Sequence, residues 1–275
     1  MTALLPPRSL LFVPGNRPER FAKADAAGAD LVCLDLEDAV APDQKVSART
    51  AVFDYLSAEQ QPACPTGVRI NATNTALGIA DLHLLLDRAV APAFVMLPKV
   101  ESAQSVEQLI DLLPGHTQVV PILESARGLA VCEAVFAVPA LQVAIFGAVD
   151  YVADIGCSPG WESLLIPRVQ LVQAAAAHDV TVLDGPYVDV RDLDGLAQQT
   201  RRARDLGLRA RSAIHPAQIP VIHTALAPTD AEIDRAEQVV AAFAAAETGA
   251  ALLDGQLIEL PVFKAAQRLL AQVRR

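Results

Sequence analysis

The sequence is short of cysteine pairs, of basic charge and of long apolar runs, and each shortage excludes a class of protein. Its four cysteines form no CxxC pair, so neither a disulfide framework nor a cysteine zinc site is expected. With 22 basic against 32 acidic residues the net charge is −10, which argues against general binding of nucleic acid or an anionic membrane. The longest uncharged stretch, 134–149, is shorter than the ~20 residues of a membrane span. The N-terminus lacks the basic region of a signal peptide, so we expect a cytoplasmic protein.

Apolar residues are abundant, at 52% of 275, which is enough to bury a large core. They gather in short runs rich in Val, Ile, Leu and Phe with little alternation, which is typical of strands buried on both faces. The predicted strands are 9–14, 31–36, 67–71, 94–98, 118–123, 142–146, 180–184 and 210–214.

Alanine-rich amphipathic segments lie between these runs and predict helices. The predicted helices are 17–27, 45–56, 79–89, 103–113, 129–136, 164–178, 193–206 and 216–226. Strand and helix alternate eight times, which indicates a parallel sheet. Eight units in this length favour a closed (β/α)8 TIM barrel over an open nucleotide-binding sheet, and no GxGxxG motif is present.

The last part of the chain departs from this alternation. Thr229 and Glu232 form a helix-start signal before a helix at 229–247, and Asp254-Gly255 marks a hairpin turn. Pro261 then opens a final helix. We therefore expect a barrel catalytic domain at 1–228 and a C-terminal helix–hairpin–helix appendage at 229–275, serving as a lid or for oligomerisation.

Ionisable side chains stand at the ends of several predicted strands. In a barrel these ends meet at one mouth, where active sites are built. Clustered acids need a cation, and carboxylates without paired histidines favour Mg²⁺. The arginine among them is suited to bind a substrate carboxylate through its two-pronged guanidinium. The residues are Asp35, Glu37, Asp38, Arg69, Glu124 and Asp150.

A series of motifs in order along the chain resembles the citrate lyase β-subunit-like branch of the HpcH/HpaI aldolase superfamily. The resemblance runs from Arg8 to about Leu270. It implies a (β/α)8 barrel, usually a trimer or dimer of trimers, that cleaves or forms carbon–carbon bonds in acyl-CoA thioesters with Mg²⁺. The motifs are RSLLFVPGNRPERFAKA, DLVCLDLEDAVAPDQK, GVRINAT, LPKVES, PILESARGL, FGAVD, AIHPAQ and DGQLIELPV.

The resemblance also implies roles for individual residues. Glu124 and Asp150 match the metal ligands, with Glu124 also close to substrate, and Arg69 matches the residue that binds the keto-acid carboxylate. Acids that hydrogen-bond metal-bound water correspond to Glu37 and Asp38. The amides expected to approach the substrate carboxylate are those of Gly147 and Ala148. The expected contacts to the CoA arm are Arg8, Arg17 and Lys45.

Two positions depart from the family pattern. The family lid often carries an aspartate thought to reach a neighbouring subunit's active site, and Glu259 stands in its place. The strand-six motif is often GAED, whereas Val149 precedes Asp150 here. Glu259 is therefore our candidate for the group that supplies a proton.

The expected reaction is cleavage of a citryl-, malyl- or citramalyl-CoA type of thioester to a keto acid and acetyl-CoA. Sequence reasoning leaves alternatives open: hydrolysis of the same thioester by a malyl-CoA thioesterase, malate-synthase-like condensation of acetyl-CoA with glyoxylate, or an aldolase that uses free acids. A non-catalytic scaffold subunit of a larger complex is the alternative from another class.

Overall fold

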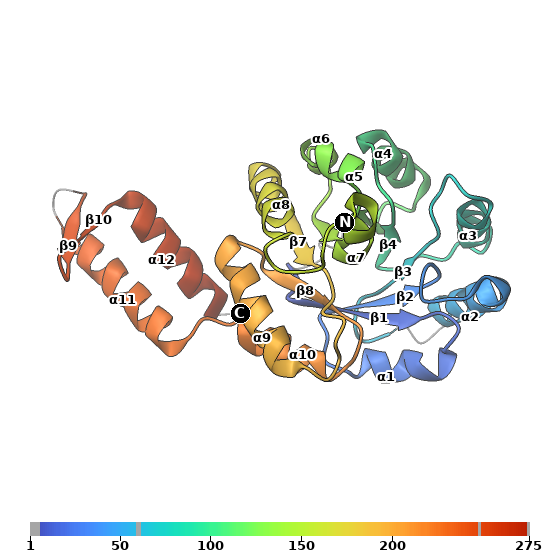
Figure 1. Ribbon diagram of the computed structural model, residues 1–275, viewed down its shortest axis with the longest axis horizontal. Coiled ribbons are helices and arrows are strands. Elements are labelled where there is room, and N and C mark those ends of the chain that lie inside the picture. Colours follow the sequence, from blue (N-terminus) through green and yellow to red (C-terminus); the bar gives the residue numbers. More distant parts are fainter. Residues whose placement is uncertain (1–5, 59–61, 247–248, 274–275) are drawn as a thin grey trace. The chain divides into compact units, whose positions relative to one another are not determined.

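The computed structural model describes residues 6–58, 62–246 and 249–273. The chain divides into two compact units, Met1–Leu226 and Ala227–Arg275, which are coloured blue to orange and orange to red in Figure 1.

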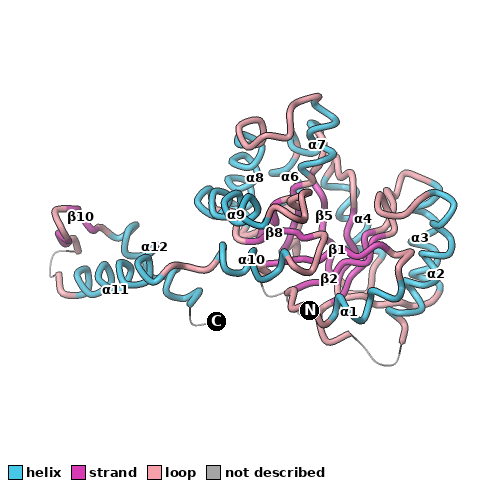
Figure 2. Tube along the Cα trace, turned by 60° about the horizontal axis from the view of Figure 1, so that its bottom comes forward, coloured by secondary structure: helices cyan, strands magenta, loops and turns pink. Residues whose placement is uncertain are grey.

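Eight parallel strands of the first unit form a closed barrel in which each strand pairs with its neighbours in the sequence and β1 pairs with β8. Helices surround the strands (Figure 2). The predicted (β/α)8 fold is therefore confirmed. The strands are β1 (Ser9–Pro14), β2 (Leu31–Asp35), β3 (Thr66–Arg69), β4 (Phe94–Leu97), β5 (Gln118–Leu123), β6 (Val143–Phe146), β7 (Thr181–Asp184) and β8 (Ala210–Ala213).

The α-helices follow the prediction except at three places. Instead of one helix at 17–27 the chain forms the 3₁₀ turn η1 (Pro18–Arg20) and the short α1 (Phe21–Asp25). The helix expected at 129–136 is divided into α5 (Ala126–Ala130) and α6 (Cys132–Phe136), because Val131 leaves helical geometry. A helix that was not predicted, α7 (Ala148–Ile155), follows β6. The others are η2 (Pro42–Gln44), α2 (Lys45–Leu56), α3 (Ala76–Asp87), α4 (Ala103–Leu112), α8 (Leu165–His178), α9 (Leu193–Leu206) and α10 (Gln218–Leu226).

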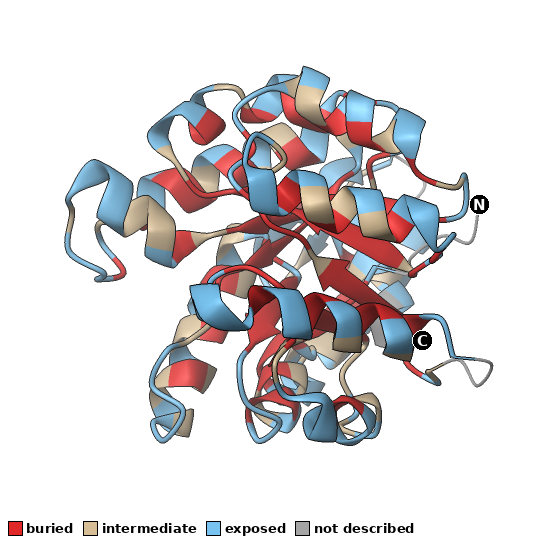
Figure 3. Ribbon diagram, turned by 90° about the vertical axis from the view of Figure 1, so that its right-hand side faces the viewer, coloured by how far each residue is buried: buried red, intermediate tan, exposed pale blue. Residues whose placement is uncertain are grey.

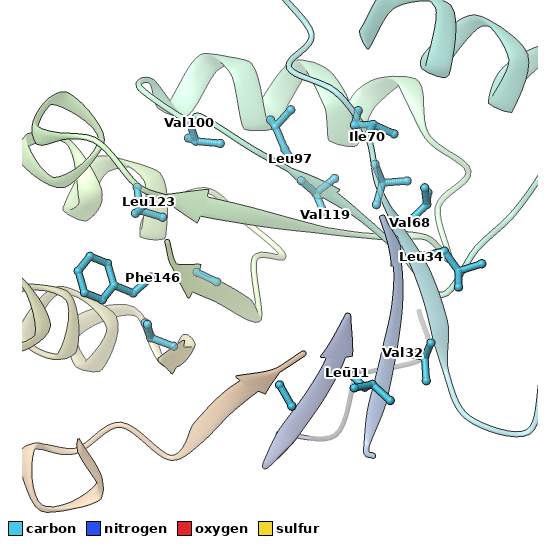
Figure 4. Close-up of a cluster of buried hydrophobic side chains, with 14 of the residues drawn as sticks. Leu11, Val32, Leu34, Val68, Ile70, Leu97, Val100, Val119, Leu123 and Phe146 are labelled. Carbon is cyan, nitrogen blue, oxygen red and sulfur yellow. The ribbon is translucent and has the colours of Figure 1, made fainter. Parts of the chain in front are cut away.

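Alternation along the strands divides the core into two layers, and nearly all strand residues are buried (Figure 3). Side chains such as Val32 and Leu34 pack between the barrel and its helices (Figure 4). Intervening residues such as Leu31 and Cys33 fill the barrel interior. Because side chains alternate with period two, the interior series of β2 continues to Asp35 at the strand's carboxyl end. Inward-facing positions at the carboxyl ends of the strands therefore place polar side chains at the barrel mouth.

The second unit consists of two helices and a hairpin. The predicted helix start is confirmed, because Thr229 and Glu232 form a reciprocal capping box. The hairpin turns at Asp254-Gly255, both with positive φ. The elements are α11 (Asp230–Ala244), β9 (Ala251–Leu253), β10 (Gln256–Ile258) and α12 (Leu260–Val273).

Phe243 and Phe263 stack with their ring centroids 4.5 Å apart, which joins α11 to α12. Within the described parts of both units, no helix has the length and apolar character needed to cross a membrane.

Candidate active site

A cavity of about 370 Å³ opens at the carboxyl ends of the barrel strands. Its polar residues come from β2 and β3 on one side and from the end of β5 and the start of α7 on the other, while β1, β6 and the segments after β7 and β8 contribute mainly apolar residues. The floor is the top of the barrel interior, where Phe12, Ile122 and Ile145 lie. The other lining residues are Pro14, Asp35, Asp38, Ala39, Arg69, Glu124, Phe146, Gly147, Ala148, Val149, Asp150, Pro186 and Ile214.

Arg69 and Asp35 form a buried ion pair on one side of the cavity. They are register partners on β3 and β2, so their inward side chains lie next to each other. Nε of Arg69 donates to Oδ1 of Asp35 at 2.7 Å and Nη2 donates to Oδ2 at 2.5 Å. Burial alone would lower the pKa of Arg69, but the charges of Asp35 and Glu37 raise it above the usual value. The two-pronged contact expected for a substrate carboxylate is thus made with Asp35.

Glu37 lies between two cations. Its Oε2 is 2.9 Å from Nη1 of Arg69, and its Oε1 is 3.3 Å from Nζ of Lys99. Burial raises the pKa of Glu37, and the charge of Arg69 partly offsets that effect. Asp38 is more exposed and stands 4.0 Å from Arg69. The structure therefore places Asp38 in the cavity lining and Glu37 in contact with the lining residue Arg69.

Glu124 and Asp150 provide neighbouring carboxyl groups on the opposite wall. Glu124 follows β5 and is only 3% exposed, and Asp150 lies in the first turn of α7. Burial, the charge of Glu37, and the charge and hydrogen bond of Asp150 raise the pKa of Glu124 to about 8, against the lowering effect of the Lys99 N–H. An acid with this pKa holds a proton at neutral pH unless a cation replaces it.

The pair fits a divalent metal ion. Within residues 6–58, 62–246 and 249–273 no three His, Cys, Asp or Glu side chains are grouped as a metal site. Mg²⁺ usually keeps several waters, however, and is bound through one or two carboxylates plus substrate oxygens. A cation between Glu124 and Asp150 would offset the burial and the neighbouring negative charges that together raise the pKa of Glu124. The two carboxylates are therefore suited to hold Mg²⁺, with water and substrate oxygens as its remaining ligands.

Gly147 and Ala148 begin α7 beside this pair. The N–H of Gly147 donates to the carbonyl of Leu123 at 3.0 Å, so that amide is engaged within the protein. A Cβ on Gly147 would lie 2.4 Å from Cβ and 2.5 Å from Oε2 of Glu124. The amide of Ala148 is in the first turn of α7, where N–H groups have no acceptor inside the helix. Gly147 makes room for Glu124, and Ala148 presents the donor.

We expect Gly147→Ala to weaken Mg²⁺ binding at least about tenfold, because displacing a supporting contact of a metal ligand typically costs 10- to 100-fold. Gly115→Ala is the matched control, since a Cβ there meets no atom within 4 Å. Calorimetric titration with Mg²⁺ measures both variants. Equal affinity of Gly147→Ala and the wild type would contradict the proposed packing of Glu124.

The remaining predicted residues lie elsewhere. Arg8 precedes β1, at the opposite end of the barrel, and its side chain pairs with Asp30 at 3.5 Å. Lys45 is buried, and its ammonium donates to two carbonyls of the β2–α2 loop and to Oδ1 of Asn71. Arg17 is exposed after β1 and lines a separate hollow of about 350 Å³. Glu259 is exposed in the second unit, between β10 and α12. The structure therefore does not gather Arg8, Arg17 or Lys45 around the cavity, and Glu259 belongs to the other unit.

Sequence reasoning did not reveal what two contributors to the site do there. Asp35 was grouped with the acids, but its pairing with Arg69 depends on strand register, which the sequence does not reveal. Lys99 has a positive φ of 54°, and the sequence offers no signal for it, because its neighbour is proline rather than a turn-forming glycine. Both residues fix the orientation of other charged groups in the cavity wall.

Comparisons with known proteins give a consistent result. The model of the family described as HpcH/HpaI aldolase/citrate lyase matches residues 8–216. Mitochondrial citramalyl-CoA lyase of Rattus norvegicus is 32% identical, with 96% of this chain and 85% of the relative covered. (3S)-malyl-CoA thioesterase of Cereibacter sphaeroides is 33% identical, with 96% of this chain and 94% of the relative covered. The crystal structure of CitE from Mycobacterium tuberculosis in complex with magnesium, acetoacetate and coenzyme A is 36% identical with a TM-score of 0.87, covering 99% of this chain and 100% of that one.

Proposed function

Because the chain belongs to the HpcH/HpaI aldolase/citrate lyase family, we propose that it is a Mg²⁺-dependent carbon–carbon lyase acting on a β-hydroxyacyl-CoA thioester. The substrate is of the citryl-, malyl- or citramalyl-CoA type, and the products are a keto acid and acetyl-CoA. The observation that carries the proposal is the neighbouring pair Glu124 and Asp150, placed in one cavity with Arg69. Relatives named citramalyl-CoA lyase and a neighbour solved with magnesium and coenzyme A support it.

The reaction breaks the bond between the hydroxyl-bearing carbon and the carbon next to the thioester. The hydroxyl group gives its proton to water, and its oxygen forms the C=O bond of the keto acid as the carbon–carbon bond breaks. The electrons of the broken bond pass to the acetyl thioester as an enolate, and a proton added to that carbon gives acetyl-CoA. Mg²⁺ supplies Lewis-acid polarisation of the substrate oxygens when bound. Glu124 and Asp150 hold the ion, Arg69 places positive charge beside the substrate, and the Ala148 N–H offers a donor to its carboxylate at the start of α7.

Two roles remain to be assigned, which are delivery of the final proton and binding of the CoA arm. We propose Glu259 of a neighbouring subunit as the donor of the final proton, in a cytoplasmic homotrimer or dimer of trimers. Its exposure and its place after β10 support this role. Of the three predicted contacts to the CoA arm, Arg17 is the best placed, because it is exposed at the carboxyl end of β1.

A second candidate is hydrolysis of the same thioester, which the resemblance to (3S)-malyl-CoA thioesterase favours. The two reactions share the substrate and differ in the bond that breaks, which is carbon–carbon in one and acyl–sulfur in the other. A scaffold without activity explains the site less well, because burying the Glu124 carboxylate beside Asp150 without a cation costs stability.

The test is incubation of the full chain with citryl-, malyl- and citramalyl-CoA, each with Mg²⁺ and with EDTA. A lyase releases acetyl-CoA and a keto acid in equal amounts from at least one thioester, and EDTA stops the reaction. Free CoA with the intact hydroxy acid would identify a thioesterase. Absence of every product would reject the proposed enzyme.

Mg²⁺ affinity is expected to depend on pH. Because the pKa of Glu124 is raised to about 8 in the metal-free protein, Mg²⁺ must displace its proton at lower pH. One displaced proton weakens binding about tenfold per pH unit below 8, and the dependence levels off above it. Calorimetry at pH 6, 7, 8 and 9, repeated in two buffers of different ionisation enthalpy, measures the affinity and the proton release. Constant affinity between pH 6 and 8 would contradict the assignment.

A further inference from the structure

Lys99 has an unusual backbone conformation at the mouth of the barrel. Its φ is +54°, a left-handed value that is disfavoured for any residue with a Cβ. The other described non-glycine residues with positive φ lie in turns or at helix ends: Ala89, Ala140, Asp179 and Asp254. Lys99 instead lies two residues after the end of β4, in the segment that joins this strand to α4. Such outliers persist where the surroundings enforce them, and they are frequent at functional sites.

The backbone of Lys99 contacts one metal-ligand candidate. Its N–H donates to Oε1 of Glu124 at 2.6 Å. The other oxygen, Oε2, lies over Gly147, within 2.5 Å of where a Cβ would stand. With Oε1 engaged by the amide, Oε2 is the oxygen of Glu124 that faces the start of α7, the helix that carries Asp150.

The side chain of Lys99 contacts the opposite wall. Its ammonium is 3.3 Å from Oε1 of Glu37, while Arg69 takes Oε2 of the same carboxylate at 2.9 Å. The Lys99 side chain is half exposed, whereas Glu37 is 7% exposed. Each oxygen of Glu37 therefore has its own cation, and one residue links the two walls of the cavity.

We propose that Lys99 is a positioning residue for the reaction: its amide orients Glu124 and its ammonium fixes Glu37. The role rests on the proposed function, because it concerns how the carboxylates around the metal are aligned. With Arg69 as its only partner, Glu37 would have one oxygen without a cation, and the Glu37 side chain would be free to turn toward the cavity. Lys99 removes that freedom, and its left-handed backbone is what allows one residue to make both contacts.

The test compares Lys99→Met with Lys99→Arg in the full chain. Lys99→Met is expected to lower kcat about 10- to 100-fold, the usual cost of losing an outer contact at a metal site. The KM for the thioester and the calorimetric Mg²⁺ affinity are expected to stay within about threefold, since the ligands remain. Lys99→Arg retains the cation and is expected to restore most of kcat. A wild-type kcat in Lys99→Met would overturn the proposal.

Backbone controls separate the ammonium from the conformation. Lys99→Gly keeps the amide and accepts the positive φ, so its kcat is expected to match that of Lys99→Met. Ala89→Gly makes the same backbone change at φ +50° on an exposed residue after α3, and it is expected to leave kcat and Mg²⁺ affinity unchanged. Recovery of kcat in Lys99→Gly would show that the ammonium is dispensable.

A double-mutant cycle with Glu37→Gln tests whether the two residues act together. If they do, kcat of the double variant is no lower than kcat of the worse single variant. The decrease in melting temperature of the metal-free double variant is then also smaller than the sum of the decreases in the two single variants. The proposal would be overturned if the fold-losses of kcat in the two single variants multiplied in the double variant and their decreases in melting temperature added. A wild type that turns over none of the thioesters would reject the proposed function instead, and the metal-free cycle then decides the role of Lys99.

Discussion

Glu124→Gln is expected to abolish measurable Mg²⁺ binding and to lower kcat/KM about 1,000-fold or more. The substitution keeps the size of the side chain and its acceptor for the Lys99 N–H, but it removes the negative charge that binds the ion. Lewis-acid polarisation of a substrate oxygen is worth several kcal/mol, and about 4 kcal/mol corresponds to three orders of magnitude in rate. Asp150→Asn is expected to behave in the same way. Calorimetry and steady-state kinetics measure the two effects.

The matched control for these variants is Glu101→Gln. Glu101 is an exposed acid near the same mouth that accepts a hydrogen bond from Ser125 at 2.9 Å, and it does not line the cavity. We expect wild-type Mg²⁺ affinity in this variant. Retention of Mg²⁺ binding by Glu124→Gln, or equal losses in Glu101→Gln, would show that the ion is held elsewhere.

Arg69→Met is expected to lower the free energy of unfolding by about 3–5 kcal/mol, because removing one partner of a buried pair leaves uncompensated charge. Asp35 would lose both charge-assisted hydrogen bonds and Glu37 its shorter ion pair. Activity is expected to fall together with stability, since the cavity would retain carboxylates without their main counter-charge. Urea unfolding and kinetics below the unfolding transition separate the two losses.

Two further variants sharpen this prediction. Arg69→Lys keeps a charge but not the fork that contacts both oxygens of Asp35, so it is expected to recover only part of the stability. Arg88→Met removes an arginine from an exposed pair with Asp54 and is expected to cost at most about 1 kcal/mol. An Arg69→Met protein as stable as Arg88→Met would refute the importance of the buried pair.

The architecture of the first unit was predictable because apolar runs and amphipathic segments alternate with little interruption. β1 was predicted at its observed bounds, and the signal at Thr229 also gave the observed helix start. Strand ends then placed Arg69, Glu124 and Asp150 at one mouth, since parallel strands in a barrel share a carboxyl end. The cavity lined by all three residues is therefore largely a consequence of the pattern in the sequence.

What sequence did not reveal depends on three-dimensional register and backbone conformation. The position of Asp150 on α7 was missed, because a short helix after Gly147 has no strong start signal. Lys45 was expected to contact the CoA arm, yet it is buried and its ammonium donates to carbonyls of the β2–α2 loop. Arg8 belongs to a motif shared with relatives, but it precedes β1 and so lies at the far end of the barrel. A motif identifies neighbours along the chain and not which end of a strand faces the cavity.

The most direct test of the account is anomalous diffraction from a crystal of the protein soaked with Mn²⁺, which takes the same oxygen ligands as Mg²⁺. A single strong peak is expected in the cavity, with carboxylate oxygens of both Glu124 and Asp150 at about 2.1 Å. A peak bonded to other side chains, or none between these two at a saturating metal concentration, would contradict it.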